Sequence, residues 1–456
     1  MMNWDNLLNS QRYGDSRKNY DAFVHRSAFQ RDFDRIIFSS AFRRMQDKTQ
    51  VFPVPESDFV HNRLTHSLEV AMVGRSLGNL AGQFILEQEP DLESKHPMNV
   101  FGDIVAAAAL AHDLGNPPFG HSGEGAIADY FLKNSFIKDF FGLTDRQWQD
   151  FTRYEGNAHG FRLLINHHPD ELKGGLRLTY ATLATFSKYP RPSLVNTYSL
   201  IDPGIKRCSA KKFSFFHSEK EAFDSIASNV GLPLLSKAKE ERLWARHPLA
   251  FMVEAADNIC YRIIDLEDGY KLSYLSLGEM EKLLIPLLLK ASDNKMALAK
   301  YHAIKDAGEK VGYLRAKAIN VLVDEVITVF KDNYKDIMSG DFDSELTDLI
   351  SSVDILEGEI KKSNIFLYNR KPVIEIELAG YQVIYGLLEK FMAIHLYPER
   401  AMSKKMKAIL PIQFHAKDTD SNYCKIMRIV DYIARMTDTY ALSLYRRLSG
   451  QSLPSL

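Results

Sequence analysis

The sequence predicts a mostly α-helical protein, and three observations support that fold class. Apolar residues recur every three or four positions over long stretches of the 456-residue chain. Alternating, strand-like runs are few and short. The composition, with 45% hydrophobic and 25% charged residues, is that of an ordinary folded protein rather than a disordered or fibrous one.

The helical periodicity covers seven segments along the chain: 66–85, 103–114, 247–268, 278–292, 313–336, 375–395 and 422–449. The segment 247–268 has the clearest end signals, because Pro248 suits a first helical turn and Gly269 suits a C-terminal cap. Residues 364–368 and 211–217 are the best strand candidates. Turn signals fall at 115–120, 169–175, 189–193 and 203–204.

No stretch of the sequence resembles an interdomain linker. We therefore predict one helical body over residues 1–270, which includes a turn-rich insertion at about 186–240. A helical C-terminal region over residues 271–456 extends this body.

The charge balance excludes a surface that binds polyanions over its whole extent, because 57 Lys and Arg face 58 Asp and Glu. Three scattered cysteines are too few for a disulfide framework and indicate a reducing compartment. The N-terminal residues lack the layout of a signal peptide, and no apolar run approaches 18 residues. We therefore expect a cytoplasmic protein that makes no contact with a membrane.

The candidate metal ligands are dispersed along the chain: His66, His112, Asp113 and Asp257. Imidazole nitrogen and carboxylate oxygen suit Mn, Fe, Zn or Ni, and Mg when enough carboxylates are present. His112 and Asp113 precede Gly115 at the predicted end of a helix, where two adjacent side chains can converge on one ion. A helix-end histidine without a ligand role would explain that pair if it stood alone.

A second candidate pair lies in the following segment, where two prolines and several glycines predict a rigid loop. His121 and Glu124 are three positions apart and share a face if a helix begins near residue 121. A histidine held by a carboxylate is the usual arrangement of a general acid or base. The alternative is a first helical turn with an acidic residue near the positive end of the helix dipole.

A polar stripe runs along the predicted helix over 247–268. Asp257, Tyr261 and Asp265 fall at i, i+4 and i+8 among apolar neighbours, so the three side chains share one face. A stripe of this kind that faces inward needs polar partners, which a metal ion and a sugar hydroxyl would supply.

Taken together, these segments resemble the deoxyguanosine triphosphate triphosphohydrolases, which belong to the HD-domain phosphohydrolases. The resemblance extends from about Arg35 to Leu448 and is carried by the motifs AFRRMQDKTQVFP, NRLTHSLEV, HDLGNPPFGHSGEG, EGNAHGFRLL, SKYP, RHPLAFMVEAADNICYRIIDLEDG and YIARMTDTYAL. It implies a helical HD-domain phosphohydrolase fold whose C-terminal region completes the substrate pocket and the oligomer contacts. It also implies hydrolysis of dGTP to deoxyguanosine and inorganic triphosphate by attack at the α-phosphorus.

The resemblance also implies roles for individual residues. One divalent ion, Mn²⁺ or Mg²⁺ before Zn, Fe or Ni, would be held by His66, His112, Asp113 and Asp257, and His121 with Glu124 would be the catalytic pair. The triphosphate contacts would be Arg63, Asn157, Lys188, Tyr189 and Lys212. The deoxyribose contacts would be Tyr261 and Asp265, with Gln50 and Val51 near the 3′-hydroxyl, and the base contacts would be Tyr368 and Glu377.

Simpler interpretations of some of these residues stay open at this stage. Lys188 and Lys212 would also suit a solvated surface, and Arg63 the entry of a helix. Tyr368 and Glu377 would also suit ordinary packing.

Three functions remain in competition. The first is a dGTP triphosphohydrolase. Asn116 weakly favours it, because many relatives of broader nucleotide specificity have histidine at that position. The second is a deoxynucleoside triphosphohydrolase of broad specificity that a nucleotide effector activates. The third is a nucleic-acid-binding regulator with the HD fold and no turnover.

The expected partners are further copies of the chain, and the resemblance implies a hexamer. Single-stranded DNA is a candidate regulator. The basic run at 404–407 suits a solvated helix face, a phosphate contact from a neighbouring subunit or a nucleic-acid contact. It has lysines where some relatives supply an arginine across the subunit interface.

Overall fold

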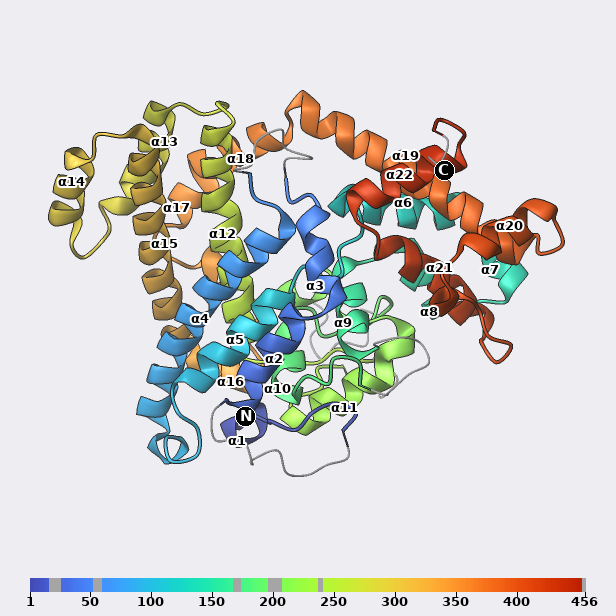
Figure 1. Cartoon of the computed structure of the whole chain (residues 1–456). Helices are drawn as coiled ribbons and strands as arrows, with labels where there is room; N and C mark the ends of the chain where they lie inside the picture. Colours follow the sequence, from blue (N-terminus) through green and yellow to red (C-terminus); the bar gives the residue numbers. More distant parts are fainter. Residues whose placement is uncertain (16–25, 52–59, 167–173, 196–206, 237–240, 453–456) are drawn as a thin grey trace.

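The computed structural model describes residues 1–15, 26–51, 60–166, 174–195, 207–236 and 241–452, and helices dominate it (Figure 1). Within these ranges, extended pairing is limited to isolated bridges, which join Arg12 to Thr179, Thr49 to Asn62, Pro192 to Phe215 and Leu234 to Trp244. The prediction of a mostly α-helical fold is therefore confirmed.

A first hydrophobic core joins the N-terminal helices to the middle of the chain. It is built on α1 (Trp4–Leu7), α2 (Ala28–Ile37), α3 (Ser40–Arg44), α4 (Arg63–Gln88), α5 (Asn99–Ala111), α9 (Gly156–Ile165), α10 (Tyr180–Phe186), α11 (Lys220–Val230), α12 (Ala250–Lys271), α13 (Leu277–Leu288), α14 (Asn294–Ala303), α15 (Ala307–Asp332), α16 (Tyr334–Ser339), α17 (Val353–Ile355) and α18 (Lys361–Tyr368). Helices α4, α5 and α12, which carry the candidate metal ligands or end beside them, pack together within this core (Figure 1).

A second hydrophobic core joins segments that are far apart in the sequence. It is built on α6 (Gly120–Lys133), α7 (Phe136–Phe141), α8 (Asp145–Thr152), α19 (Lys371–Leu396), α20 (Ala401–Ile409), α21 (Asn422–Ala434) and α22 (Asp438–Leu448). Helix α19 lies along α6 and carries the chain from the first core to the second (Figure 1). The predicted division near residue 270 stays a prediction.

Short helical turns complete the described structure. They span Met45–Asp47, Pro90–Leu92, Cys208–Ala210, His217–Glu219, Leu346–Asp348 and Ile412–Phe414, and a π-helical turn spans Leu356–Ile360. Cys208, Cys260 and Cys424 are free thiols, as the sequence indicates. Among the described helices, none combines the length and the hydropathy that crossing a membrane requires.

Helices α4 and α5 approach each other closely because glycines line their contact. A Cβ atom on Gly78 would lie 2.8 Å from the Cα atom of Gly102, and a Cβ atom on Gly74 would lie 3.1 Å from the side chain of Val105. This close approach brings the start of α4 near the end of α5, where two candidate ligands lie.

Both strand predictions are wrong. Residues 364–368 form the end of α18, and Asn364 and Leu367 are buried one helical turn apart. Residues 211–217 contain only the bridge from Phe215 to Pro192. Leu367 and Phe215 are buried in the first core, and Phe213 and Phe216 are buried in the second. Burial of this kind does not require a sheet partner.

The ends of α12 also differ from the sequence prediction. Pro248 precedes the helix, whose N-cap is Leu249, and the helix continues past Gly269 to Lys271. Gly269 is instead a packing residue, because a Cβ atom there would lie 2.8 Å from the side chain of Leu367. The predicted helix over 422–449 is two helices, and Thr437 caps the second with a hydrogen bond from the amide of Tyr440.

Candidate active site

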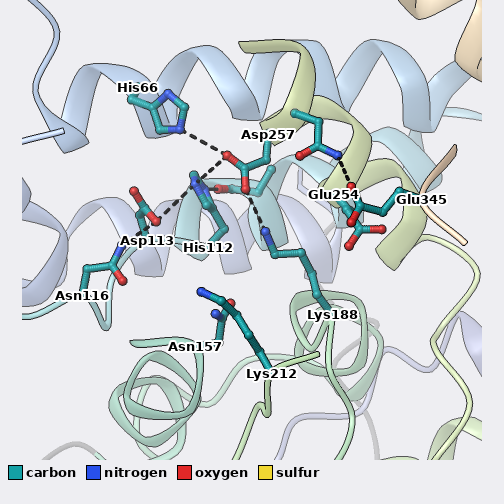
Figure 2. A network of polar contacts seen from close by, with 12 residues as sticks. His66, His112, Asp113, Asn116, Asn157, Lys188, Lys212, Glu254, Asp257 and Glu345 are labelled. Carbon is teal, nitrogen blue, oxygen red and sulfur yellow. Dashed lines mark hydrogen bonds and ion pairs between the residues drawn. The ribbon is translucent and has the colours of Figure 1, made fainter. Parts of the chain in front are cut away.

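Three side chains from three helices converge on one point in the first core (Figure 2). His66 comes from the first turn of α4, His112 follows the last residue of α5, and Asp257 lies in α12. Asp257 Oδ1 lies 3.3 Å from His66 Nε2 and 3.4 Å from His112 Nε2. The two imidazole rings meet edge to face, with centroids 5.3 Å apart.

The backbone fixes the orientation of His112. Its Nδ1 atom lies 2.7 Å from the carbonyl oxygen of Ala109 in the same helix, so Nδ1 carries the proton and donates. The Nε2 atom therefore presents a lone pair to the point of convergence. This arrangement is typical of a metal-ligating histidine, because the outer hydrogen bond selects the tautomer that coordinates.

Asp113 lies at the edge of this group. Its Oδ1 atom is 3.5 Å from His112 Nε2 and accepts a hydrogen bond of 2.7 Å from the side-chain amide of Asn116. Its Oδ2 atom pairs with Arg63 at 2.5 Å. Burial opposes ionisation of this carboxyl, but Arg63 together with His112 and His66 outweighs burial and lowers the pKa of Asp113, so Asp113 is a carboxylate.

The residues present suit a divalent cation. His66, His112 and Asp257 place one ligand atom each within 4.8 Å of one another. The two carboxylate oxygens of Asp257 have different partners. Oδ2 pairs with Lys188 at 2.8 Å, and Oδ1 faces the histidines. Two imidazole nitrogens with carboxylate oxygen form the mixed donor set that divalent transition metals prefer.

The predicted pair of His121 and Glu124 forms at the start of α6. Glu124 Oε2 lies 2.6 Å from His121 Nδ1, and Glu124 Oε1 accepts a hydrogen bond of 2.6 Å from the amide of Gly156. Glu124 is 9% exposed, whereas the side chain of His121 is 81% exposed. The hydrogen bond that His121 Nδ1 donates to the Glu124 carboxylate raises the pKa of His121, because it stabilises the imidazolium.

The backbone entering α6 is shaped to aim this pair. Phe119 and Gly120 both have positive φ, at 62° and 56°. A Cβ atom on Gly120 would lie 2.6 Å from Nη2 of Arg63, so glycine is needed for both its conformation and its space. The turn therefore lets Arg63 pass beneath the start of α6.

One cavity of about 420 Å³ brings most of the predicted site residues together. Its lining includes Gln50, Val51, Arg63, His112, Asp113, His121, Asn157, Lys188, Tyr189, Lys212, Asp257, Tyr261, Tyr368 and Glu377. The remaining predicted residues, His66, Glu124 and Asp265, are buried behind this lining and contact it through Asp257, His121 and Tyr368 respectively.

The cations of the cavity are held by carboxylates. Lys188 is buried, so its interpretation as a surface lysine is wrong. Lys212 Nζ lies 3.4 Å from Glu155 Oε1, which also accepts a hydrogen bond of 2.7 Å from the side chain of Asn157 (both cavity residues are in Figure 2). Glu155 was not anticipated from the sequence.

The side chains of the polar stripe on α12 differ in how deeply they are buried. Asp265 is buried and accepts a short hydrogen bond from the hydroxyl of Tyr368. Burial raises the pKa of Asp265 to about 8. Tyr261 is 41% exposed, and its ring lies 5.6 Å from that of Tyr368.

Sequence reasoning also missed a clamp that joins the C-terminal helices to the segments that precede α4 and α6. Asp438, the first residue of α22, accepts hydrogen bonds from the amides of Thr49, at 2.8 Å, and Phe119, at 2.9 Å. Lys48 Nζ donates to the carbonyl oxygens of Asn116, at 2.5 Å, and Ala434, at 3.1 Å. The motif YIARMTDTYAL contains Asp438, but its partners in the fold are not visible in the sequence.

We expect the substitution Asp438→Asn to weaken this clamp. An amide side chain has one acceptor oxygen, so one of the two backbone amides loses its partner in a buried place. The free energy of unfolding should fall by about 1 to 3 kcal/mol, the usual cost of an unsatisfied buried group. Chemical denaturation measures this change, and Asp418→Asn, on the exposed surface, is the control. Equal stability of the two variants would contradict the clamp.

The comparisons with known proteins agree with this architecture. The chain matches the HD domain over residues 63–173 and the phosphohydrolase-associated domain over residues 361–447. The first match holds His66, His112, Asp113, His121 and Glu124, and the second covers the helices of the clamp. The protein is therefore a hydrolase of the HD-domain class, a class that depends on a metal ion.

Curated relatives narrow the class to a family. The chain is 41% identical to a deoxyguanosinetriphosphate triphosphohydrolase-like protein of Synechocystis, over 99% of this chain and 100% of the relative. It is 38% identical to a protein of the same description from Pseudomonas aeruginosa strain LESB58, over the full length of both. It is 30% identical to a deoxyguanosinetriphosphate triphosphohydrolase of Enterobacter, over 92% of this chain and 93% of the relative. The chain belongs to the deoxyguanosinetriphosphate triphosphohydrolase family.

Proposed function

We propose that this protein hydrolyses dGTP to deoxyguanosine and inorganic triphosphate by attack of water at the α-phosphorus. The observation that carries the proposal is the single cavity in which Arg63, Lys188 and Lys212 lie beside a metal-ligand group and His121. Its volume of about 420 Å³ lies within the range of small-molecule sites.

We further propose that one divalent ion is held by His66, His112, Asp113 and Asp257. Mn²⁺ and Mg²⁺ are the favoured ions, and Zn, Fe and Ni are the alternatives. When bound, such an ion polarises a phosphoryl oxygen and lowers the pKa of water. The remaining chemistry falls to the side chains of the protein.

The triphosphate would be bound by Arg63, Lys188 and Lys212, with Asn157 and Tyr189 beside them. These cations come from distant parts of the chain, so a protein with a net charge of −1 can still concentrate positive charge in one pocket. Positive charge fixed beside the leaving triphosphate stabilises the charge that builds up on it during the reaction.

His121 would move the proton, and Glu124 would keep its imidazole oriented. Because His121 Nδ1 is held by Glu124, Nε2 is the ring nitrogen available to a substrate or a water molecule. The exposed side chain of His121 lines the cavity that contains the cations. A positioned acid or base of this kind contributes about 100- to 10,000-fold to a rate.

The sugar would lie against Tyr261, with Asp265 behind the ring of Tyr368, and Gln50 and Val51 would lie near its 3′-hydroxyl. The carboxyl of Asp265 is mostly uncharged near pH 7, because burial raises its pKa to about 8. A neutral carboxyl both donates and accepts hydrogen bonds, which suits a site for hydroxyl groups.

We expect Tyr261→Ala to relax discrimination against ribonucleotides. Loss of the ring opens space beside the sugar, so the ratio of kcat/KM for dGTP over GTP should fall by about 10- to 200-fold, the range for one lost steric contact. Steady-state assays with both nucleotides measure that ratio, and Tyr261→Phe, which keeps the ring, is the control. Unchanged rejection of GTP would contradict the assignment.

The base would be read at the mouth of the cavity by Glu377 and Tyr368. Glu377 lines the cavity and makes no ion pair with any residue in the described ranges. A carboxylate can accept hydrogen bonds from the neighbouring N–H donors of guanine, a pair that adenine lacks. This complementarity supports dGTP as the substrate.

One observation favours a second candidate, a triphosphohydrolase of broader deoxynucleotide specificity that an effector nucleotide activates. The hydroxyl of Tyr368 is engaged by Asp265, so its ring face is the part offered to a base. Stacking on a ring face tolerates every base. Assays of all four deoxynucleotides, with and without a second nucleotide, decide between the two, and equal turnover of dATP and dGTP would overturn guanine specificity.

Product analysis with dGTP tests the reaction itself. Incubation with Mn²⁺ or Mg²⁺ should release inorganic triphosphate and deoxyguanosine in equal amounts, as measured by phosphorus NMR and chromatography. Release of pyrophosphate or single phosphates would place the attack at another bond and contradict the proposal. Absence of turnover combined with binding of DNA would favour the regulator.

We also propose a homo-oligomer, with the hexamer of the family resemblance as the expected form and single-stranded DNA as its candidate regulator. Light scattering coupled to size-exclusion chromatography measures the oligomeric state, and a monomeric mass would contradict this proposal.

A further inference from the structure

A second cavity, of about 580 Å³, lies far from the candidate active site and is lined by basic side chains. The end of α19, helix α20 and the start of α21 form its walls, next to α7 (Figure 1). Lysines contribute most of its charge, namely Lys404, Lys407, Lys417 and Lys425, and Asp418 is the one acidic residue among the described lining residues. None of the roles proposed above uses this cavity.

The positive charge here is only partly balanced. Within the described ranges, no carboxylate lies within ion-pair distance of Lys407 or Lys425, whereas Lys404 reaches the exposed Glu399 at 3.2 Å. Asp420, the next acidic residue along this loop, is engaged by Arg428 at 2.7 Å. A protein with a net charge of −1 therefore places two lysines without an ion-pair partner among the described residues, Lys407 and Lys425, at one cavity.

A partly buried histidine lies close to Lys407 and Lys425. His395 Nε2 is buried and has no hydrogen-bond partner among the described residues. Burial lowers the pKa of His395 to about 4, and the charges of Lys425 and Lys407 contribute to this shift. His395 also lines the cavity, and its neutral imidazole leaves the positive charge there to the lysines.

The start of α21 adds to the same preference. Asn422, the first residue of this 13-residue helix, lines the cavity, so the positive end of the helix dipole lies there. The other wall is apolar and includes Phe141, Ile394 and Leu410. The volume lies within the range of sites for small organic ligands, about 300 to 1,000 Å³.

This cavity is separate from the candidate active site. Helix α19 is continuous from Glu377, which lines the active-site cavity, to His395. Eighteen residues at 1.5 Å each place the two about 27 Å apart. The triphosphate of one substrate molecule cannot reach both.

We propose that the basic cavity binds a small anion that carries several phosphate groups. The shared chemistry is a polyphosphate chain, which occurs as inorganic triphosphate and as the tail of a nucleoside triphosphate. Lys407 and Lys425 provide its charge partners, and the backbone amides at the start of α21 provide neutral donors.

Titration calorimetry with inorganic triphosphate on the full chain tests this proposal. The double substitution Lys407→Glu with Lys425→Glu should lower the affinity of the basic cavity for triphosphate by about 100-fold, since each charge-assisted contact accounts for about tenfold. Lys405→Glu is the control for the charge reversal on α20, because it makes the same change as Lys407→Glu alone but does not line the cavity. Equal weakening by the control, or none by the double variant, would overturn the proposal.

The number of bound molecules separates this site from the active site. If the proposed function holds, the wild-type chain binds two triphosphates and the double variant binds one. If the proposed function fails, the wild-type chain binds one triphosphate and the double variant binds none. The double variant therefore binds one triphosphate fewer than the wild type in either case. Should the glutamate variant unfold, Lys407→Gln with Lys425→Gln provides the same comparison with a smaller perturbation.

Two further ligands identify the source of the phosphate. A nucleoside triphosphate that binds this site more tightly than inorganic triphosphate would show that the apolar wall takes a base, and equal affinity would identify the inorganic anion. A single-stranded oligonucleotide whose binding depends on Lys407 and Lys425, while triphosphate binding does not, would overturn the proposal in favour of nucleic acid.

Discussion

Replacing His121 with alanine should lower kcat by about 100- to 10,000-fold and leave KM nearly unchanged, the effect of removing a positioned proton donor or acceptor. His121 lines the cavity with an exposed side chain, so its loss should leave the packing of the cavity intact. Its contribution therefore falls on the chemical step and not on binding. Steady-state kinetics with dGTP measures both constants.

His302→Ala is the matched control for this substitution, because His302 is an exposed histidine on α14, outside both cavities. It should change neither constant. Weaker binding with unchanged turnover in the His121 variant would instead identify a substrate contact and contradict the role in proton transfer.

The pH dependence of the rate tests the role of Glu124. Its hydrogen bond raises the pKa of His121, so the imidazolium persists to higher pH in the protein than in a free histidine. The substitution Glu124→Gln removes the negative charge and lowers that pKa. The limb of the kcat/KM profile that reports His121 should therefore move to lower pH, whichever direction the proton travels. A limb that stays in place would show that Glu124 does not act on His121.

The sequence was sufficient for the side chains whose position depends on local structure. His66 lies in the first turn of a capped helix, His112 at the end of another, and His121 and Glu124 one turn apart. Helical spacing alone places such residues on a shared face or at a shared end. The resemblance to a family then grouped the helices that carry them.

The sequence could not predict how deeply each side chain is buried or which residues far apart in the chain are in contact. Asp257, Tyr261 and Asp265 share a face of α12, yet Asp265 is buried and Tyr261 is partly exposed, because neighbouring helices cover the stripe unevenly. The hydrogen bond from Phe119 to Asp438 joins residues 319 positions apart. No local pattern encodes a contact of that kind, so the clamp required the folded structure.

Asp257→Ala should have the second large effect, with loss of the bound metal ion and a fall in turnover of at least about 1,000-fold, since a metal ion at a phosphoryl centre contributes several kcal/mol. Among the residues that the structure describes, Asp257 is the one that lies beside both histidines, so the convergent set cannot form without it. Elemental analysis of the purified variant measures the metal, and dGTP assays measure turnover.

Lys188→Met separates the metal role of Asp257 from its ion pair. Asp257 Oδ2 pairs with Lys188, so alanine at 257 also releases a buried cation, and this release alone could disturb the cavity. Methionine at 188 removes the cation but leaves Oδ1 of Asp257 facing the histidines. The Lys188 variant should keep its metal and raise KM, because it loses the proposed phosphate contact, whereas the Asp257 variant should lose the metal. If Asp257→Ala keeps both metal and activity, the ion is bound elsewhere and the proposed metal site is wrong.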